Sequence, residues 1–266
     1  MLVARDVSAV LGDRRRIVDR VDIAVVPGRV TAVIGPNGAG KSTLLRLIAG
    51  ELAPAAGTVT LNGTPLSAWR SRERARQLAV LPQSTTLDFA FRVEEVVGLG
   101  RLPHGDDETR GRGHRVVTAA LDAVGLGAFA ERLYPTLSGG EQQRVQLARC
   151  LAQVDLLPDE TPAAPRYLLL DEPTTSLDPA HQLSVLALAR RLAARGLGVL
   201  AVLHDLGLAA SIADELVVMA AGRVVAAGPP RETLTTQLIA DVYGIEAMVL
   251  PNPAGPGVLV APRFAA

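Results

Sequence analysis

Short apolar runs alternate with longer stretches of helical periodicity along this chain. Three of these runs, residues 30–34, 167–170 and 199–203, are almost entirely apolar, which is typical of parallel strands that are buried on both faces. Each run ends at a glycine-rich or polar segment, and ligands of open parallel sheets bind at the carboxyl ends of the strands. The pattern therefore predicts an α/β fold with polar groups gathered at one edge of a parallel sheet.

The first part of the chain has a different pattern. Residues 2–8, 21–26 and 59–61 read as short strands, and the last of them precedes the turn-forming pair Asn62 and Gly63. We therefore expect an N-terminal antiparallel β layer beside the parallel sheet.

A helical insertion is predicted between two strands of the core. Residues from about 85 to 158 show helical periodicity and no strong strand, and a proline-rich loop at 158–165 leads back into the core. After residue 217 the pattern predicts a hairpin that turns at Ala221 and Gly222.

Composition argues against several classes of protein. The formal net charge of the 266 residues is zero, so the basic surplus of a nucleic-acid-binding protein is absent. No apolar run reaches the roughly 18 residues of a transmembrane helix, and the acidic Asp6 near the start is unlike a signal peptide. The single cysteine, Cys150, cannot form an internal disulfide, which fits a reducing cytosol.

A phosphate-binding loop follows the run at 30–34. Its residues match the pattern G-x-x-x-x-G-K-[ST], and a helical segment follows. The set is Gly35, Pro36, Asn37, Gly38, Ala39, Gly40, Lys41, Ser42 and the adjoining Thr43. Glycines let backbone N–H groups converge on phosphate oxygens, Lys41 is placed to reach the β- and γ-phosphates of ATP, and Ser42 to ligate Mg²⁺. A glycine-rich turn that only resembles such a loop is disfavoured by the strand–loop–helix context.

Lys41 is also the only lysine among the 27 basic side chains. In a chain that uses arginine at every other basic position, a retained ammonium indicates a site that needs a compact charge. This observation supports the phosphate loop.

Two carboxylates follow the run at 167–170. Asp171 is placed to hold Mg²⁺, and Glu172 is placed to polarise an attacking water. A solvated acidic pair at a strand end is the structural alternative, and the phosphate loop elsewhere in the chain makes it weaker.

A second anion site is predicted at residues 138–141. Ser138 and Glu141 form an S-x-x-E capping box at the start of a helix that ends near Gln153. Capping alone does not explain Gly139 and Gly140, which leave bare N–H groups at a helix N-terminus. A γ-phosphate held by both this site and the phosphate loop would require two subunits that face each other.

These motifs resemble the ABC (ATP-binding cassette) transporter ATPases. The phosphate loop, LPQ at 81–83, LSGGE at 137–141, LLLDEPT at 168–174, SLD at 176–178 and His204 occur in the order usual in that family. The resemblance covers about residues 1–240. It implies a P-loop NTPase fold with a RecA-like core at 1–84 and 159–240, a helical subdomain at about 85–158, and a C-terminal extension at 241–266.

The family resemblance also implies roles for individual residues. It implies a head-to-tail homodimer in which Ser138, Gly139, Gly140 and Glu141 contact the ATP held by the partner's phosphate loop. Gln83 would join the Mg²⁺ shell with Ser42 and Asp171, and Asp178 would bridge the two sites. His204 would contact the γ-phosphate and orient the water with Glu172 as the catalytic base.

The chain departs from the family at the adenine. The family usually has an aromatic residue near the start of the chain that stacks on the base. The corresponding position is aligned here with Ala9, and no aromatic residue precedes Trp69. We therefore expect weak discrimination between ATP and GTP.

Segments 81–104 and 137–153 resemble the importers of iron-siderophores, haem and cobalamin, and segment 171–182 most resembles haem (hemin) importer ATPases. The resemblance implies two transmembrane permease subunits, a periplasmic binding protein, a place at the cytoplasmic face of the inner membrane, and no contact with the transported ligand or nucleic acid. Ferric-siderophore or cobalamin import is the near alternative. A soluble ABC ATPase of DNA repair or translation usually carries a long coiled coil or two cassettes, and a P-loop kinase has no role for LSGGE.

Overall fold

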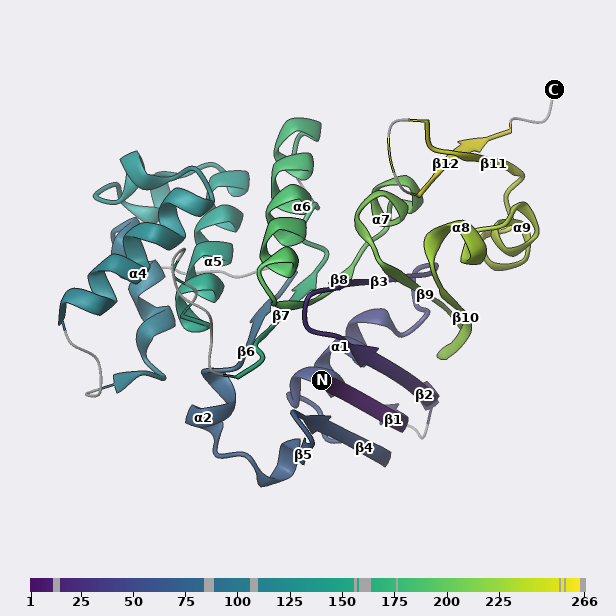
Figure 1. The fold of residues 1–266 in the computed structure, drawn as a ribbon, viewed down its shortest axis with the longest axis horizontal. Coiled ribbons are helices and arrows are strands. Elements are labelled where there is room, and N and C mark those ends of the chain that lie inside the picture. The colour runs from purple at the N-terminus through teal and green to yellow at the C-terminus, as the bar shows by residue number, and fades with distance from the viewer. Residues whose placement is uncertain are drawn as a thin grey trace.

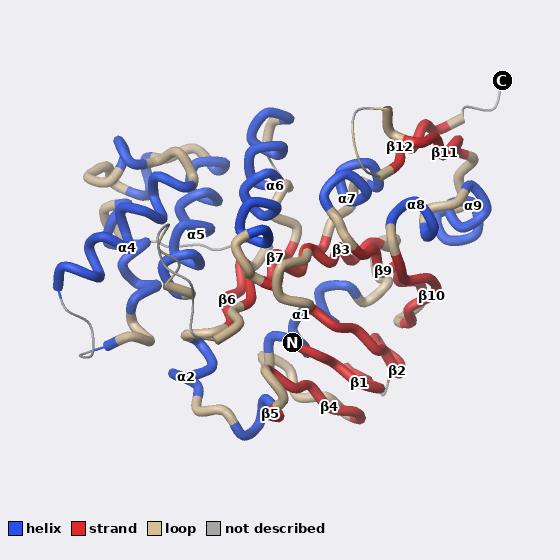
Figure 2. The backbone as a smooth tube through the Cα atoms, viewed as in Figure 1, coloured by secondary structure: helices blue, strands red, loops and turns tan. Residues whose placement is uncertain are grey.

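A mainly parallel sheet lies at the centre of the fold, with helices on both of its faces (Figures 1 and 2). The computed structural model describes residues 1–11, 15–83, 89–105, 110–155, 157, 164–175, 177–253, 255 and 257–263. Within these residues the sheet has six strands. In sheet order they are β10 (Arg223–Gly228), β9 (Glu215–Ala220), β3 (Val30–Ile34), β8 (Gly198–Val202), β7 (Tyr167–Asp171) and β6 (Leu78–Leu81).

The three predicted parallel strands are present as β3, β7 and β8, and every residue of each is buried. The hairpin of β9 and β10 is also confirmed, because its turn falls at Ala221 and Gly222, both with positive φ. The parallel strand β6 was not predicted. Its four residues become recognisable only through their pairing with β7.

The antiparallel layer near the N-terminus is confirmed, and it lies below the central sheet in Figure 1. Its order is β2 (Arg15–Val25), β1 (Leu2–Leu11), β4 (Ala56–Leu61) and β5 (Thr64–Pro65). Asn62 and Gly63 have φ values of 51° and 85°, the two positive angles that a tight two-residue hairpin requires. Helix α1 (Lys41–Ala49) packs between this layer and the sheet through Leu44, Leu47 and their neighbours.

The helical subdomain lies on the opposite side of the fold from the C-terminal hairpin (Figure 1). It contains α3 (Val93–Gly98), α4 (Arg110–Ala123) and α5 (Gly139–Gln153), with short 3₁₀ turns at Leu99–Arg101, Gly127–Phe129 and Tyr134–Thr136. The helical periodicity predicted for this region is present in α3, where Val93, Val96 and Val97 are buried on one face. The expected ends of the insertion, near residues 85 and 158, lie outside the described residues, so this division stays a prediction.

A buried ion pair lies within the helical subdomain. Arg101 and Asp155 are each about 8 % exposed, and Arg101 Nη1 lies 2.8 Å from Asp155 Oδ1. Arg112 of α4 donates a second hydrogen bond of 2.8 Å to Asp155 Oδ2. Burial raises the pKa of Asp155, but the hydrogen bond from Arg112 and the charge of Arg101 outweigh it and hold that pKa below its usual range.

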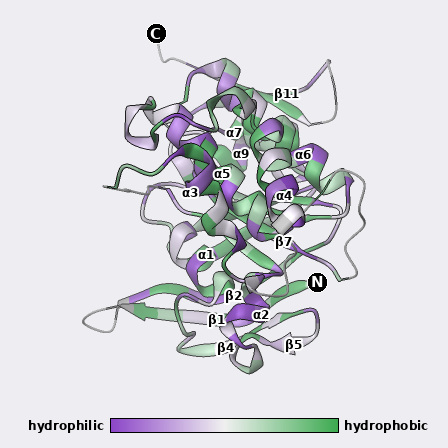
Figure 3. Ribbon diagram, turned by 90° about the vertical axis from the view of Figure 1, so that its left-hand side faces the viewer, coloured by the Kyte–Doolittle hydropathy of each residue, from purple (hydrophilic) through white to green (hydrophobic). Residues whose placement is uncertain are grey.

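The remaining helices complete the layers. They are α2 (Ser71–Ala75), α6 (Pro179–Ala194), α7 (Leu206–Ile212), α8 (Pro230–Thr233) and α9 (Thr236–Tyr243). Helix α2 buries none of its residues, and Figure 3 colours it as hydrophilic. The expected extension at 241–266 includes a hairpin of β11 (Ala247–Pro251) and β12 (Val258–Pro262) that packs on α7 and α9. Its boundary at residue 240 falls inside α9 and stays a prediction.

The described part of the chain contains no helix that is long and apolar enough to span a bilayer.

Candidate functional site: a phosphate cleft and a second anion site

The phosphate loop joins the buried end of β3 to the first turn of α1. Its backbone needs glycine at two positions. Gly35 has a φ of 153°, and a Cβ there would collide with the backbone oxygen of Met219. Gly40 has a φ of 97°, and its Cβ would lie 2.5 Å from the backbone oxygen of Ile17. The loop is therefore held between β9 and β2, with the N–H groups of α1 at its end.

Lys41 lies in the first turn of α1 and is only 6 % exposed. Its Nζ donates hydrogen bonds to the backbone oxygens of Gly35 at 2.8 Å and Pro36 at 3.1 Å. Burial lowers the pKa of this ammonium, while the charges of Glu172 and Asp171 act in the opposite direction. A buried ammonium that donates to two backbone carbonyl oxygens is well suited to exchange them for phosphate oxygens.

Asp171 ends β7, and it faces Ser42 of α1. The Ser42 hydroxyl donates a hydrogen bond of 3.1 Å to Asp171 Oδ1. Burial raises the pKa of Asp171, with the nearby charge of Glu172 acting in the same direction and the Ser42 hydrogen bond against it. A bound cation would offset this cost, and paired carboxylate and hydroxyl oxygens are ligands that suit Mg²⁺.

Glu172 lies at the centre of the polar cluster at the sheet edge. Its backbone has a φ of 51°, and its N–H donates to the oxygen of Val202 at 3.2 Å, which ties the turn after β7 to β8. Glu172 Oε1 lies 2.5 Å from His204 Nε2, and Oε2 accepts a hydrogen bond of 2.7 Å from Gln83 Nε2. Thr175 Oγ1 donates to the same Oε2 at 3.3 Å. The structure thus brings together the three predicted residues Gln83, Glu172 and His204.

These elements enclose a cavity of about 300 Å³, which we call the phosphate cleft. Its lining contains most of the predicted loop together with the predicted base and histidine: Asn37, Gly38, Ala39, Gly40, Lys41, Ser42, Thr43, Glu172, His204 and, in addition, Ile17. Gly35 and Pro36 lie at the start of the loop, where their oxygens hold Lys41. The sequence expectation that these groups meet at one edge is confirmed.

The residue aligned with the family's adenine-stacking position is buried. Ala9 is 1 % exposed and packs in the apolar cluster around α1, so it does not line the phosphate cleft. Ile17 of β2 does line it. The sequence does not identify Ile17 as a site residue, because it fits the ordinary alternation of apolar and polar residues along β2. It reaches the cleft only through the packing of the N-terminal layer. Thr175 was also missed, although it adjoins the Asp171–Glu172 pair.

The predicted second anion site lies at the start of α5. The Ser138 backbone N–H and hydroxyl both donate to Glu141 Oε2 at 2.8 Å, and Ser138 Oγ accepts from the Glu141 N–H at 3.4 Å. The predicted capping box is therefore present. These hydrogen bonds from Ser138 hold the pKa of Glu141 below its usual value.

A cavity of about 420 Å³ opens over this helix start. Its lining joins Ser138, Gly139, Gly140 and Glu141 to Asp178, the N-cap of α6, and to Arg144, Leu177 and His181. Asp178 Oδ2 lies 2.6 Å from His181 Nδ1, and its pKa is lowered by the hydrogen bonds that His181 donates. None of these residues lines the phosphate cleft. Ser176, part of the same predicted motif, lies outside the described residues.

Comparison with known proteins agrees with this geometry. The family model described as ABC transporter matches residues 18–175. A relative from Gloeobacter violaceus, named hemin import ATP-binding protein HmuV, is 51 % identical over 239 residues, which cover 90 % of this chain and 86 % of the relative. A relative with the same name from Rhizobium meliloti is 45 % identical over 268 residues, which cover 100 % of this chain and 99 % of the relative.

Among solved structures, a bacterial ABC transporter cassette whose structure is described as dimeric has the same fold. The TM-score is 0.74 at 23 % identity, and the match covers 86 % of this chain and 98 % of that chain.

Proposed function

The chain belongs to the ABC transporter family of ATP-binding, ATP-hydrolysing subunits, and from this premise we propose that it powers the import of haem across a bacterial inner membrane. The observation that carries the choice of haem is the 51 % identity, over 90 % of this chain, with a protein named for hemin import. The phosphate cleft supplies the chemistry of hydrolysis.

ATP is the nucleotide that the family binds, and we place its phosphates over Gly35 to Thr43. Mg²⁺ fits the oxygen donors that the structure presents there. Ser42 Oγ and Asp171 Oδ1 are 3.1 Å apart, and Gln83 contacts the neighbouring carboxylate of Glu172. We assign Ser42, Asp171 and Gln83 to that cation, which supplies charge neutralisation for the phosphates when it is bound.

Glu172 acts as the base that takes a proton from the attacking water, through a carboxylate oxygen. His204 Nε2 contacts this carboxylate at 2.5 Å and holds it in one orientation. The Thr175 hydroxyl donates a hydrogen bond to the other carboxylate oxygen, Oε2. The positive φ of Glu172 sets the direction in which its side chain leaves the backbone. Lys41 balances the negative charge that develops on the terminal phosphate.

The two anion sites of one chain have no lining residue in common. We propose that a second copy supplies the missing half, so that each ATP lies between the phosphate loop of one copy and residues 138–141 of the other. The exposed Asp178 would lie at the junction of the two sites. ATP would then favour the closed homodimer because both halves bind it, and ADP would not.

In the complete importer we place this homodimer against two transmembrane permease subunits on the cytoplasmic face of the membrane, with a periplasmic binding protein on the other side. The ATPase needs no contact with haem for transport, because closure of the dimer acts on the permeases.

Two experiments test the proposal. Cells that lack the native subunit, grown with haem as the sole iron source, should regain growth with this chain and not with its Glu172→Gln variant. Growth on a ferric siderophore or dependence on cobalamin, without growth on haem, would replace haem by that cargo.

The shared site is tested with mixed variants. Lys41→Ala and Ser138→Arg should each be nearly inactive alone, and their mixture should recover part of the turnover, because one of the two sites in a mixed dimer is intact. A mixture that stays as inactive as its components would refute the shared site.

A further inference from the structure

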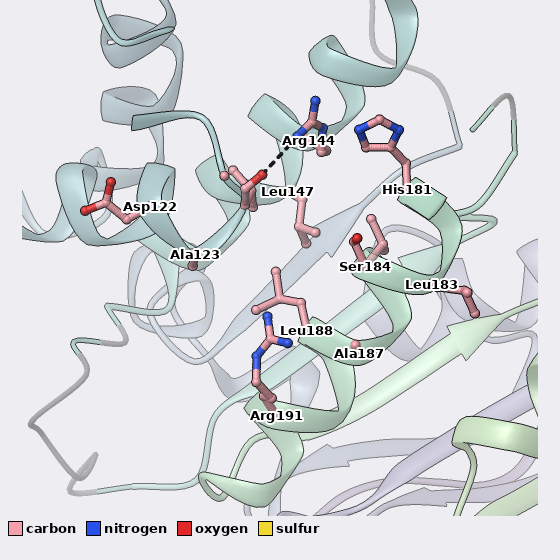
Figure 4. A pocket seen from close by; sticks show the side chains of 13 residues that line it. Asp122, Ala123, Arg144, Leu147, His181, Leu183, Ser184, Ala187, Leu188 and Arg191 are labelled. Atoms are coloured by element: carbon pink, nitrogen blue, oxygen red, sulfur yellow. Dashed lines mark hydrogen bonds between the residues drawn. The ribbon is translucent and has the colours of Figure 1, made fainter. Parts of the chain in front are cut away.

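A second type of cavity, of about 560 Å³, lies between α4, α5 and α6 (Figure 4). We call it the lateral cavity. It has no lining residue in common with the phosphate cleft, and its volume falls in the range of roughly 300–1,000 Å³ that is usual for small-molecule sites. It shares Arg144 and His181 with the cavity of the second anion site, and neither the hydrolysis of ATP nor the homodimer described above uses its other lining residues.

The inner wall of the lateral cavity is apolar. Leu147 of α5 and Val185 and Leu188 of α6 line it and are between 2 % and 6 % exposed. Leu147 and Leu188 lie on facing sides of the gap between the two helices (Figure 4). Leu183 also lines the cavity and is 58 % exposed. A lining of this kind suits a flat, apolar ligand that enters edge-on.

Two arginines give the cavity a positive rim. Arg191 of α6 is exposed, and its guanidinium has no ion pair or side-chain hydrogen bond among the described residues. Arg144 of α5 donates only to the Val124 oxygen, at 3.3 Å, and its buried Nε has no hydrogen-bond partner within the described part of the chain. The acid on the lining, Asp122, lies beside Gly127 at the far side, on α4. The rim therefore favours a ligand with carboxylates.

His181 lies in the first turn of α6 and lines the lateral cavity. Its Nδ1 lies 2.6 Å from Asp178 Oδ2, a carboxylate oxygen that accepts, so in the neutral ring Nδ1 is the donor and the lone pair is on Nε2. A carboxylate behind the imidazole is the usual arrangement of a metal-binding histidine, and a single histidine holds the iron of many haem proteins.

We propose that the lateral cavity binds haem and that bound haem slows ATP hydrolysis, so that accumulated cargo inhibits its own import. The porphyrin would lie between α5 and α6, with its carboxylate edge toward Arg191 and its iron on His181 Nε2. This inference rests on haem import as the proposed function. The ATPase subunit of a haem importer would lie on the cytoplasmic side of the membrane, where the imported haem is released.

The position of the lateral cavity explains the inhibition. His181 and Arg144 also line the cavity of the second anion site, and Ser138 and Asp178 are the N-caps of α5 and α6. A rigid ligand that fixes α5 relative to α6 would fix both helix starts in one arrangement. The adjustment needed to close the site over ATP would then be lost.

The test is a titration of the purified chain with hemin, followed by the Soret absorption band, with ATP turnover measured at each concentration. We expect saturable binding of one hemin per chain and at least a threefold loss of turnover at saturation. Arg191→Glu should weaken binding at least about tenfold and relieve inhibition, because a charge-assisted contact becomes a repulsion. Its own turnover without hemin should match the wild type, since Arg191 lies three turns along α6 from Asp178.

The matched control is Arg5→Glu, which makes the same charge change at an exposed position on β1. It should bind hemin as the wild type does. His181→Ala should still take up hemin but lose the spectrum of histidine-ligated iron. Equal affinity in Arg191→Glu and Arg5→Glu, or unchanged turnover with hemin bound, would overturn the proposal. If laurate displaced bound hemin as readily as free hemin does, the cavity would be assigned to amphiphilic carboxylates in general instead of to haem.

The outcome is separable from that of the proposed function. Arg191→Glu should still restore growth on haem, because transport does not need the lateral cavity. Growth on haem with no hemin binding would reject only the cavity, whereas hemin binding with no growth on haem would reject haem import.

Discussion

Replacement of Glu172 by glutamine is the sharpest perturbation of the phosphate cleft. The variant has nearly the same shape and removes only the charge and the proton-accepting oxygen. Its amide oxygen can still accept the hydrogen bond that Gln83 donates at 2.7 Å, and its amide N–H can donate to a neutral His204. We therefore expect the free energy of unfolding to change by less than about 1 kcal/mol.

Turnover should respond far more strongly. A general base contributes roughly 10²–10⁴ in rate, so the barrier should rise by about 3–5 kcal/mol. The assay is phosphate release at saturating ATP and Mg²⁺, with ATP binding measured by nucleotide fluorescence and the dimer measured by light scattering. We expect ATP to bind, the dimer to accumulate, and hydrolysis to fall by at least a hundredfold.

The control is Glu51→Gln, which removes an equal charge from a half-exposed acid whose field reaches Asp171 without contact. It should keep turnover within about threefold of the wild type, since a solvent-exposed charge acts weakly at a distance. If Glu172→Gln also retained near-normal turnover, Glu172 could not be the base, and the proposed mechanism would be refuted.

Three further predictions follow from the described contacts. Hydrolysis of ATP and GTP should differ by less than tenfold in kcat/KM. Ile17→Tyr should raise the preference for ATP, because an aromatic ring could then stack on the base. A strong ATP preference in the wild type would show that another group recognises the base. Asp155→Ala should destabilise the chain by about 3–5 kcal/mol in urea unfolding, because it leaves Arg101 as a buried charge without its carboxylate. The pKa of Asp155 is lower in the folded state, so the ionised carboxylate contributes to the free energy of unfolding above the unfolded pKa of about 3.9, and this contribution is lost as pH falls toward the folded pKa. The difference in unfolding free energy between the wild type and Asp155→Asn should therefore shrink over that acidic range. A difference that is independent of pH would contradict this prediction. Ser138→Ala should cost about 1 kcal/mol of stability through the lost N-cap of α5, and unchanged stability would show that Glu141 caps the helix alone.

Local sequence determined the elements that carry the chemistry. A glycine-rich loop after an apolar strand has few conformations open to it, so the order β3, phosphate loop and α1 followed from residues 30–49 alone. The capping box of Ser138 and Glu141 is likewise a local hydrogen-bond pattern, and it is present as predicted. The meeting of the phosphate loop, Glu172 and His204 followed from one general rule, that the carboxyl ends of parallel strands share an edge. The individual roles of these residues remain predictions.

Tertiary packing decided what lies between elements that are distant in sequence. Strand β6 is too short to be distinguished by its own pattern, and pairing with β7 makes it a strand. Ile17 reaches the phosphate cleft, and Ala9 does not, because the irregular pairing of β1 with β2 sets which side chains turn inward. The lateral cavity exists only because α5 and α6, which belong to different parts of the chain, pack side by side without filling the space between them. Local sequence constrains dihedral angles and hydrogen bonds within a few residues, whereas cavities and long-range contacts depend on how whole elements pack.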